Sequence, residues 1–124
     1  NMHTFGVALR GDTVFGLFEH HTGGTTAEVL AALVQSLSDG SLTHDDVIRL
    51  GGHGAAFHPE YAHSGPFRFV TGTGPNRRIA RTLGFHEAAP HGDMMLTGAF
   101  GLVEAVIRQL NADGYALPVA TLIP

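Results

Sequence analysis

The hydrophobic period of this 124-residue sequence changes between residues 20 and 25. Residues 3–20 alternate apolar with small or polar side chains, which predicts two short β-strands. In residues 25–39 the apolar side chains recur three and four positions apart, as on one face of a helix. A chain that carries both periods in its first forty residues is neither all-α nor all-β. The alternation of strands and helices favours an α/β fold.

Local signals predict where these first elements turn and end. Gly11-Asp12 suits a two-residue hairpin turn with glycine at its first central position. The stretch Thr25-Thr26-Ala27-Glu28 has the spacing of a capping box, with its first threonine as the expected cap. Gly40 is expected to end that helix, and a second helix is predicted over residues 43–50 with Thr43 as its cap.

The second half of the chain is less regular. Residues 51–66 are rich in Gly, Pro and His without any period, and they predict a long irregular loop. The elements expected after it are a strand, two helices and an edge strand, at residues 67–71, 76–83, 93–111 and 116–123. The apolar face of the last helix is expected to point into the core.

Composition excludes several classes of function. The chain has no Cys, which excludes disulfides, thiolate nucleophiles, thiolate-held zinc and iron–sulfur clusters. All seven basic residues are Arg, so the chain supplies neither a Walker-A lysine nor a Schiff-base lysine. A net charge of −4 makes nucleic acid an unexpected partner. No apolar run approaches the ~18 residues of a membrane helix, and we expect a cytoplasmic protein without a membrane partner.

Nine histidines are the most distinctive chemical feature of the chain. Glu19 and His21 are expected to share one face of a strand, with His20 on the opposite face. The other candidates are His53, His58 and His63 in the predicted loop and His86, His91 and Asp93 near the last helix. Imidazoles and a carboxylate suit a transition-metal site. One predicted function is therefore a metal-dependent hydrolase, with Glu19 or Glu87 as the base.

A second candidate site lies where the strand ending at Thr71 runs into a Gly-rich turn. A strand, a turn of this kind and a helix leave backbone N–H groups free for a nucleotide. Four arginines close to the turn, Arg68, Arg77, Arg78 and Arg81, could meet phosphates or form a solvated helix face. An ordinary connection between a strand and a helix is the alternative interpretation of the turn.

Four stretches of the chain resemble a known family. They are Asn1-Met2-His3-Thr4, Phe18-Glu19-His20-His21-Thr22-Gly23-Gly24, Gly51-Gly52-His53-Gly54 and Ala89-Pro90-His91-Gly92-Asp93-Met94-Met95-Leu96-Thr97-Gly98. In these stretches the chain is similar to a prokaryotic family labelled as related to the pyruvate formate-lyase activating enzyme.

The order of the pieces also resembles the second lobe of the actin, sugar-kinase and Hsp70 superfamily. The pieces are an N-terminal hairpin, a strand entering Gly72-Thr73-Gly74-Pro75-Asn76, and a helix of small residues from Thr97 to Gly101. The resemblance implies an RNase H-like fold, with a mixed sheet that begins with the hairpin and is packed against helices. It implies that residues 1–124 form a single α/β domain and one lobe of a larger two-lobed protein. The start at Asn1 predicts completion by a missing first lobe, a cleaved partner chain or a second copy in a homo-oligomer.

The same resemblance implies a nucleotide-binding lobe, with ATP or another nucleotide bound together with Mg²⁺. The residues expected at the nucleotide are Asn1, His3, Thr4, Gly72, Thr73, Gly74 and Asn76. A transition metal held by histidine is the alternative cofactor, and His91 and Asp93 are its expected ligands.

Both functions place a site where strand ends converge. The start of the first strand, the end of the second and the turn at residues 72–74 are expected to meet, with His91 and Asp93 nearby. Glu19, His20 and His21 are the expected catalytic residues, because an imidazole titrates near working pH. The alternative for the two histidines is a hydrogen-bonded pair that fixes the turn at residues 22–24.

Overall fold

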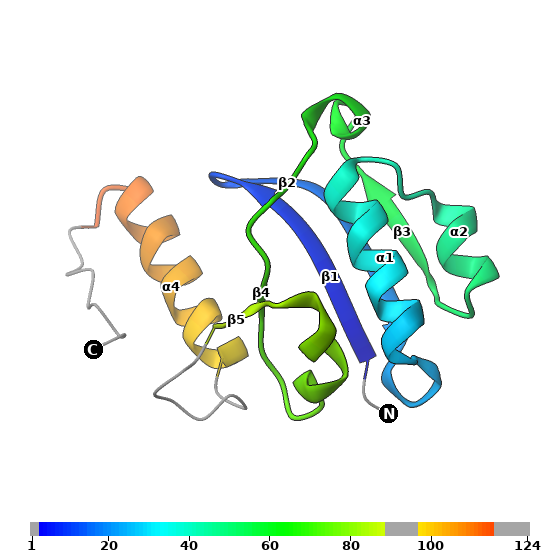
Figure 1. Ribbon diagram of the computed structural model, residues 1–124. Coiled ribbons are helices and arrows are strands. Elements are labelled where there is room, and N and C mark those ends of the chain that lie inside the picture. The colour runs from blue at the N-terminus through cyan, green and yellow to red at the C-terminus, as the bar shows by residue number, and fades with distance from the viewer. Residues whose placement is uncertain (1–2, 89–96, 116–124) are drawn as a thin grey trace. The chain divides into compact units, whose positions relative to one another are not determined.

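The computed structural model describes residues 3–88 and 97–115. The elements, with η for a 3₁₀ helix, are β1 (His3–Arg10), β2 (Thr13–His21), η1 (Thr22–Gly24), α1 (Ala27–Asp39), α2 (His44–Arg49), β3 (Gly54–Phe57), α3 (Tyr61–Ser64), β4 (Thr71–Gly72), η2 (Arg77–Leu83), β5 (His86–Glu87) and α4 (Thr97–Ala112) (Figure 1). The chain is thus a mixed α/β protein. None of these helices combines the length and the hydropathy needed to cross a membrane.

The chain divides into two compact units. The first comprises Asn1–Gly72 and Asn76–His86, and the second comprises Thr73–Pro75 and Glu87–Pro124. The three-stranded sheet formed by β1, β2 and β3 and the helices α1, α2 and α3 all belong to the first unit.

The main sheet has the order β1-β2-β3 and is antiparallel at both pairings. The predicted hairpin is confirmed: residues 11 and 12 connect β1 to β2, and Gly11 has the left-handed φ of 58° that such a turn requires. After β2, α1 runs back along the sheet and residues 40–53 return to the end at which β2 stops. Gly54 consequently lies opposite Glu19 in the register, and β3 runs antiparallel rather than forming the mixed sheet that was expected.

The core lies between the sheet and α1, which covers one sheet face in Figure 1. Leu30, Leu33 and Leu37 of α1 are buried, as the helical period predicted. They meet a sheet face of mostly small residues, from which Phe18 projects with no exposed surface. Burial of that ring contributes roughly 1.5–3 kcal/mol. Gly6 makes room for it, since a Cβ there would collide with the Phe18 ring.

Other large apolar side chains of the hairpin lie on the opposite face of the sheet from Phe18. Phe5 is 61% exposed, and Val7 and Leu9 follow it along the same face of β1. The alternation predicted an amphipathic strand without saying which face a helix covers. Small residues allow a helix to approach the sheet closely, and α1 packs on the face that carries them.

The first turn of α1 differs from its prediction by one residue. Thr26, not Thr25, is the N-cap, and its hydroxyl accepts the Val29 N–H at 3.2 Å. The Thr25 hydroxyl is buried instead and donates to the His21 carbonyl at 2.5 Å. Because the Thr25 hydroxyl donates its hydrogen bond to the preceding strand, it does not cap the helix, and Thr26 is the N-cap instead.

The other predicted helix signals are confirmed. Gly40 ends α1 in the left-handed conformation, with φ of 82°. Thr43 caps α2 through a capping box in which the Asp46 N–H donates to the Thr43 hydroxyl and the Thr43 N–H donates to the Asp46 carboxylate. Both signals involve residues within a few positions of each other.

The prediction of an irregular loop over residues 51–66 is wrong. The segment contains β3 and α3. β3 has no alternation of its own and is ordered by its pairing with β2. α3 is anchored by Tyr61, which is buried and places its hydroxyl 3.1 and 3.0 Å from the carbonyl oxygens of Ser36 and Leu37. Both elements depend on partners distant in the sequence.

The strand predicted over residues 67–71 is also mostly wrong. Only Thr71–Gly72 is a strand, paired with β5. The Phe67 N–H donates at 2.7 Å to the carbonyl of Ser38 near the end of α1, so the start of the segment bonds to a helix end and not to a strand. The helix predicted over residues 76–83 is present as η2 and ends at Gly84, with φ of 60°.

α4 lies in the second unit and begins at Thr97, with its predicted first turn at residues 93–96 outside the described residues. Leu102, Val103 and Val106 are exposed within the part of this unit that the structure describes. Within the described part of this unit, no second helix or sheet is available to cover them. The expectation that the apolar face of this helix points into a core stays a prediction. The edge strand predicted at 116–123 also lies outside the described residues.

Candidate metal centre

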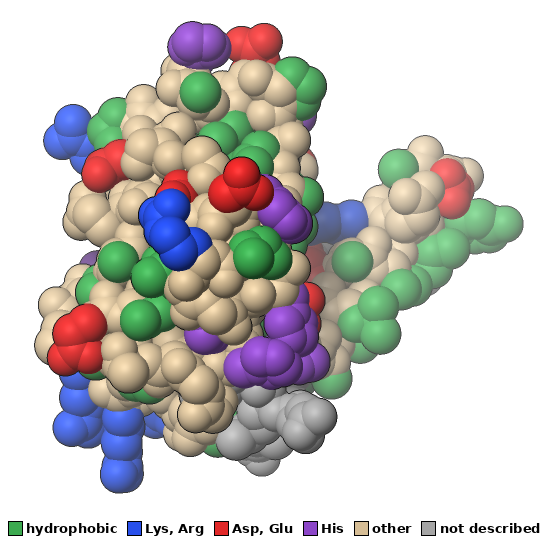
Figure 2. All heavy atoms as spheres, turned by 90° about the vertical axis from the view of Figure 1, so that its right-hand side faces the viewer, with side chains coloured by type: hydrophobic (Ala, Val, Ile, Leu, Met, Phe, Trp, Pro, Cys, Tyr) green, Lys and Arg blue, Asp and Glu red, His purple; other side chains and the backbone are tan. Residues whose placement is uncertain are grey.

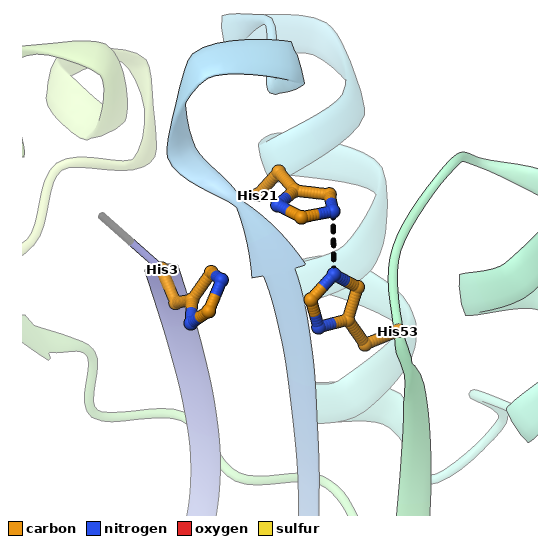
Figure 3. A group of neighbouring side chains, drawn as sticks. All are labelled: His3, His21 and His53. Carbon is orange, nitrogen blue, oxygen red and sulfur yellow. Dashed lines mark hydrogen bonds between the residues drawn. The ribbon is translucent and has the colours of Figure 1, made fainter. Parts of the chain in front are cut away.

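Three histidines from separate segments meet at one end of the main sheet. His3 opens β1 and lies opposite His21, the last residue of β2, in the hairpin register. His53 directly precedes β3, and its N–H donates to the Glu19 carbonyl at 2.9 Å. One ring nitrogen from each histidine lies within 4.8 Å of the other two, and Figure 3 shows the rings turned toward one another. Among the described residues, these three histidines form the group whose ligand atoms have the spacing of a metal site.

The three rings form a compact and accessible group. Their centroids are 5.4 Å apart for His3 and His21, 5.0 Å for His3 and His53, and 4.0 Å for His21 and His53. The Nε2 atoms of His21 and His53 are 2.5 Å apart, so one of these nitrogens donates a proton to the other. All three residues are exposed, and Figure 2 shows histidine side chains gathered at the molecular surface. An ion from solvent can therefore reach them.

A carboxylate lies against two of the rings. Glu19 Oε1 is 3.0 Å from Nδ1 of His3 and 3.5 Å from Nδ1 of His53. Glu19 and His21 share a face of β2, as the strand period predicted. The site therefore combines three imidazoles with one acidic group that contacts two of them.

The environment of His21 favours its neutral form. Partial desolvation lowers the pKa of His21 below the usual value, and electrostatic repulsion from the neighbouring His53 and His3 rings, when these carry a proton, lowers it further. A neutral imidazole keeps a lone pair, which a metal ion requires.

His20 points to the opposite face and has a different environment. Its side chain is 1% exposed. Nδ1 lies 2.5 Å from the Thr25 hydroxyl and 3.0 Å from the His21 carbonyl, and Nε2 lies 2.9 Å from the Leu50 carbonyl. The ring thus connects the end of β2 to the start of α1 and the end of α2. These contacts favour the hydrogen-bonded alternative for His20, and its catalytic role stays a prediction.

Two glycines place His53 over the sheet. Gly51 has a φ of 90°, which disfavours any other residue. A Cβ on Gly52 would lie 2.6 Å from Val47 and 2.9 Å from the Glu19 carbonyl, so only glycine lets this chain segment approach β2. In the sequence, the Gly51-Gly52 pair before His53 is the only local sign of this close approach. The residues around it show no hydrophobic period, and they predicted only a loop.

The residues predicted for a nucleotide are distributed more widely. Thr4 lies on the opposite face of β1 from His3, in register with His20. Gly72 lies in β4, where a Cβ would be 2.9 Å from the Phe85 ring, and Asn76 precedes η2. Thr73 and Gly74 belong to the second unit. Asn1, together with the predicted metal ligands His91 and Asp93, lies outside the described residues.

Three further histidines have contacts elsewhere in the described part of the chain. His58 Nδ1 accepts the Glu60 N–H at 3.1 Å, and His44 Nδ1 lies 3.2 Å from the Ala55 N–H. The ring of His86 stacks on Phe69. In the described part of the chain, these histidines do not join His3, His21 and His53. Of the predicted convergence, the structure thus brings together the start of the first strand and the end of the second, and adds His53.

A comparison with protein families finds a match. The family model described as "Putative pyruvate format-lyase activating enzyme (DUF1786)" matches residues 1–79, well over half of the chain. The matched segment contains the three clustered histidines and Glu19. Comparisons with curated proteins and with solved structures found no match.

Proposed function

We propose that this chain, which belongs to the DUF1786 family, binds a divalent transition-metal ion through His3, His21 and His53. The observation that carries the proposal is the meeting of three imidazole nitrogens within 4.8 Å from three separate segments. Imidazole is a ligand for zinc, copper, iron and nickel. Metal–nitrogen bonds of about 2.0–2.1 Å place the nitrogens of a tetrahedral site about 3.3 Å apart. Small shifts of the exposed rings would therefore bring the three nitrogens to the spacing that a bound ion requires.

The donor set supports a catalytic more than a purely structural ion. Three protein ligands leave a fourth position for water or substrate, as in hydrolytic zinc sites. An ion at this position would supply an activated water near neutral pH, which makes metal-assisted hydrolysis the reaction class that we propose. The chain has no Cys, so a thiolate-held cluster is outside the chemistry of its own side chains.

The nucleotide-binding alternative stays a prediction. The likeness to the second lobe of actin, sugar kinases and Hsp70, with its RNase H-like fold and ATP site, rests on the order of the sequence elements. A three-stranded antiparallel sheet packed against helices occurs in many α/β folds. A completing lobe, a cleaved partner chain, a second copy and a cytoplasmic location are likewise predictions.

Titration of metal-free protein with Co²⁺ and Zn²⁺ tests the proposal directly. We expect one ion per chain and a visible spectrum of nitrogen-coordinated Co²⁺. Zn²⁺ at 100 times its Kd should raise the free energy of unfolding by about 2.7 kcal/mol. A parallel titration with ATP and Mg²⁺ separates the two functions. Saturable nucleotide binding without any bound Co²⁺ or Zn²⁺ would contradict the metal site.

The lowered pKa of His21 predicts a pH dependence of folding. In unfolded protein His21 titrates near about 6.5, whereas in the folded protein it takes up a proton only at lower pH. As the pH falls below about 6.5, the unfolded state binds more protons and the free energy of unfolding decreases. Urea unfolding of metal-free wild type and His21→Ala at several pH values between 7.5 and 5 measures this effect. The wild type should lose more stability than the variant over that range, and equal losses would contradict the prediction.

A further inference from the structure

We infer that the Glu19 carboxylate selects the tautomers of the candidate metal centre, so that His3 and His53 each keep an unprotonated Nε2 for the ion. The inference rests on the proposed metal function and deepens it. It makes Glu19 a positioning residue, where the sequence predicted a catalytic base.

The first step concerns the nitrogens that face the carboxylate. Glu19 Oε1 is 3.0 Å from Nδ1 of His3 and 3.5 Å from Nδ1 of His53, so one oxygen contacts both rings. An ionised carboxylate can only accept hydrogen bonds, so its charge favours the proton of each ring on the facing Nδ1. In a neutral imidazole the other nitrogen is then unprotonated. On both rings that nitrogen is Nε2.

The third ring agrees with this assignment. Nε2 of His21 lies within hydrogen-bond distance of Nε2 of His53, and such a contact has one nitrogen as donor and the other as acceptor. Since His53 has its proton on Nδ1, the shared proton belongs to His21, which donates to His53. The opposite tautomer of His53 would place a lone pair against the carboxylate oxygen. The contacts among the four residues are consistent with a single arrangement of protons.

The backbone holds Glu19 in this position. β2 is the central strand of the sheet, and Glu19 pairs with Phe5 on one side and with Gly54 on the other. His3 is therefore its diagonal neighbour on β1, within reach of a long side chain. The Glu19 carbonyl also accepts the His53 N–H at 2.9 Å. The side chain thus projects from the one strand that adjoins both histidines.

This geometry predicts what loss of the carboxylate does. Groups that orient metal-binding histidines typically change metal affinity 10- to 100-fold when they are removed. Glu19→Ala removes the acceptor, while Glu19→Gln keeps an acceptor oxygen without the charge. Glu60→Ala is the matched control, because Glu60 is an exposed acidic residue on a different segment and outside the cluster.

The test combines ¹⁵N NMR of the imidazoles in metal-free protein with Co²⁺ titration. We expect the Nδ1–H tautomer for His3 and His53 in wild type and in Glu60→Ala. In Glu19→Ala the rings should shift toward Nε2–H, and the Kd for Co²⁺ should rise roughly 10- to 100-fold. Glu19→Gln should lie between Glu19→Ala and wild type in both measurements.

The outcomes separate the inference from the metal function. Nε2–H tautomers of His3 and His53 in the wild type overturn the inference, whether or not an ion binds. So does a loss of affinity in Glu19→Ala with unchanged tautomers, because Glu19 would then act as a direct ligand. The expected tautomers in a protein that binds no Co²⁺ support the role of Glu19 and overturn the proposed function instead.

Discussion

Replacing His21 by Ala is expected to weaken Co²⁺ and Zn²⁺ binding by roughly 100-fold or more, and to leave the melting temperature of the metal-free protein almost unchanged. Structural zinc sites with four ligands contribute about 10–16 kcal/mol, or roughly 3 kcal/mol per ligand. Each 1.4 kcal/mol corresponds to about tenfold in affinity. The His21 side chain is exposed, and truncation of an exposed side chain usually changes stability by no more than about 0.5 kcal/mol.

The measurements are Co²⁺ titration by visible absorbance and thermal unfolding of metal-free protein near pH 7.5. His63→Ala is the matched control, since His63 is an exposed histidine of α3 outside the cluster. It should leave both the Kd for Co²⁺ and the melting temperature as in the wild type. An unchanged metal affinity in His21→Ala, or a melting temperature that falls by many degrees, would exclude His21 as a ligand supported by a stable scaffold.

The adjacent substitution, His20→Ala, is expected to have the opposite effect and to lower the free energy of unfolding by about 2–4 kcal/mol. The His20 ring is buried and lies within hydrogen-bond distance of the Thr25 hydroxyl and the Leu50 carbonyl. A buried polar group that loses its partner costs about 1–3 kcal/mol. The removed ring also leaves a cavity, which adds to the loss.

Urea unfolding of metal-free protein measures this prediction, with His21→Ala as the comparison. If His20→Ala is too unstable to purify, His20→Asn provides a second measurement, because its side-chain amide retains a hydrogen-bond donor. That variant should recover part of the lost stability. A loss below 0.5 kcal/mol in His20→Ala, together with impaired metal binding, would instead assign His20 to the site.

Several features of the fold were predictable from short stretches of sequence. The hairpin turn at Gly11 and the cap at Thr43 depend on residues only a few positions apart, and both predictions are confirmed. The buried face of α1, with Leu33 at its centre, follows from a helical period that any amphipathic helix shows. These features are local, so their energies hardly depend on the rest of the chain.

Other features were decided by tertiary contacts. The capping-box spacing favoured Thr25 as the cap of α1, but the burial of Thr25 against the end of β2 leaves that position to Thr26. β3 has no strand signal of its own and depends on the adjoining edge of β2. The exposed position of Phe5 could not be predicted either, because alternation does not tell which face of a sheet a helix covers.

The candidate metal centre combines both kinds of information. That Glu19 and His21 share a face of one strand follows from the sequence, because side chains alternate along any strand. That His3 and His53 join them depends on contacts between distant segments. The hairpin register sets His3 opposite His21, and the close approach of Gly52 to β2 brings in His53. Strand pairing and backbone approach act between segments distant in the sequence, and no local pattern encodes either of them.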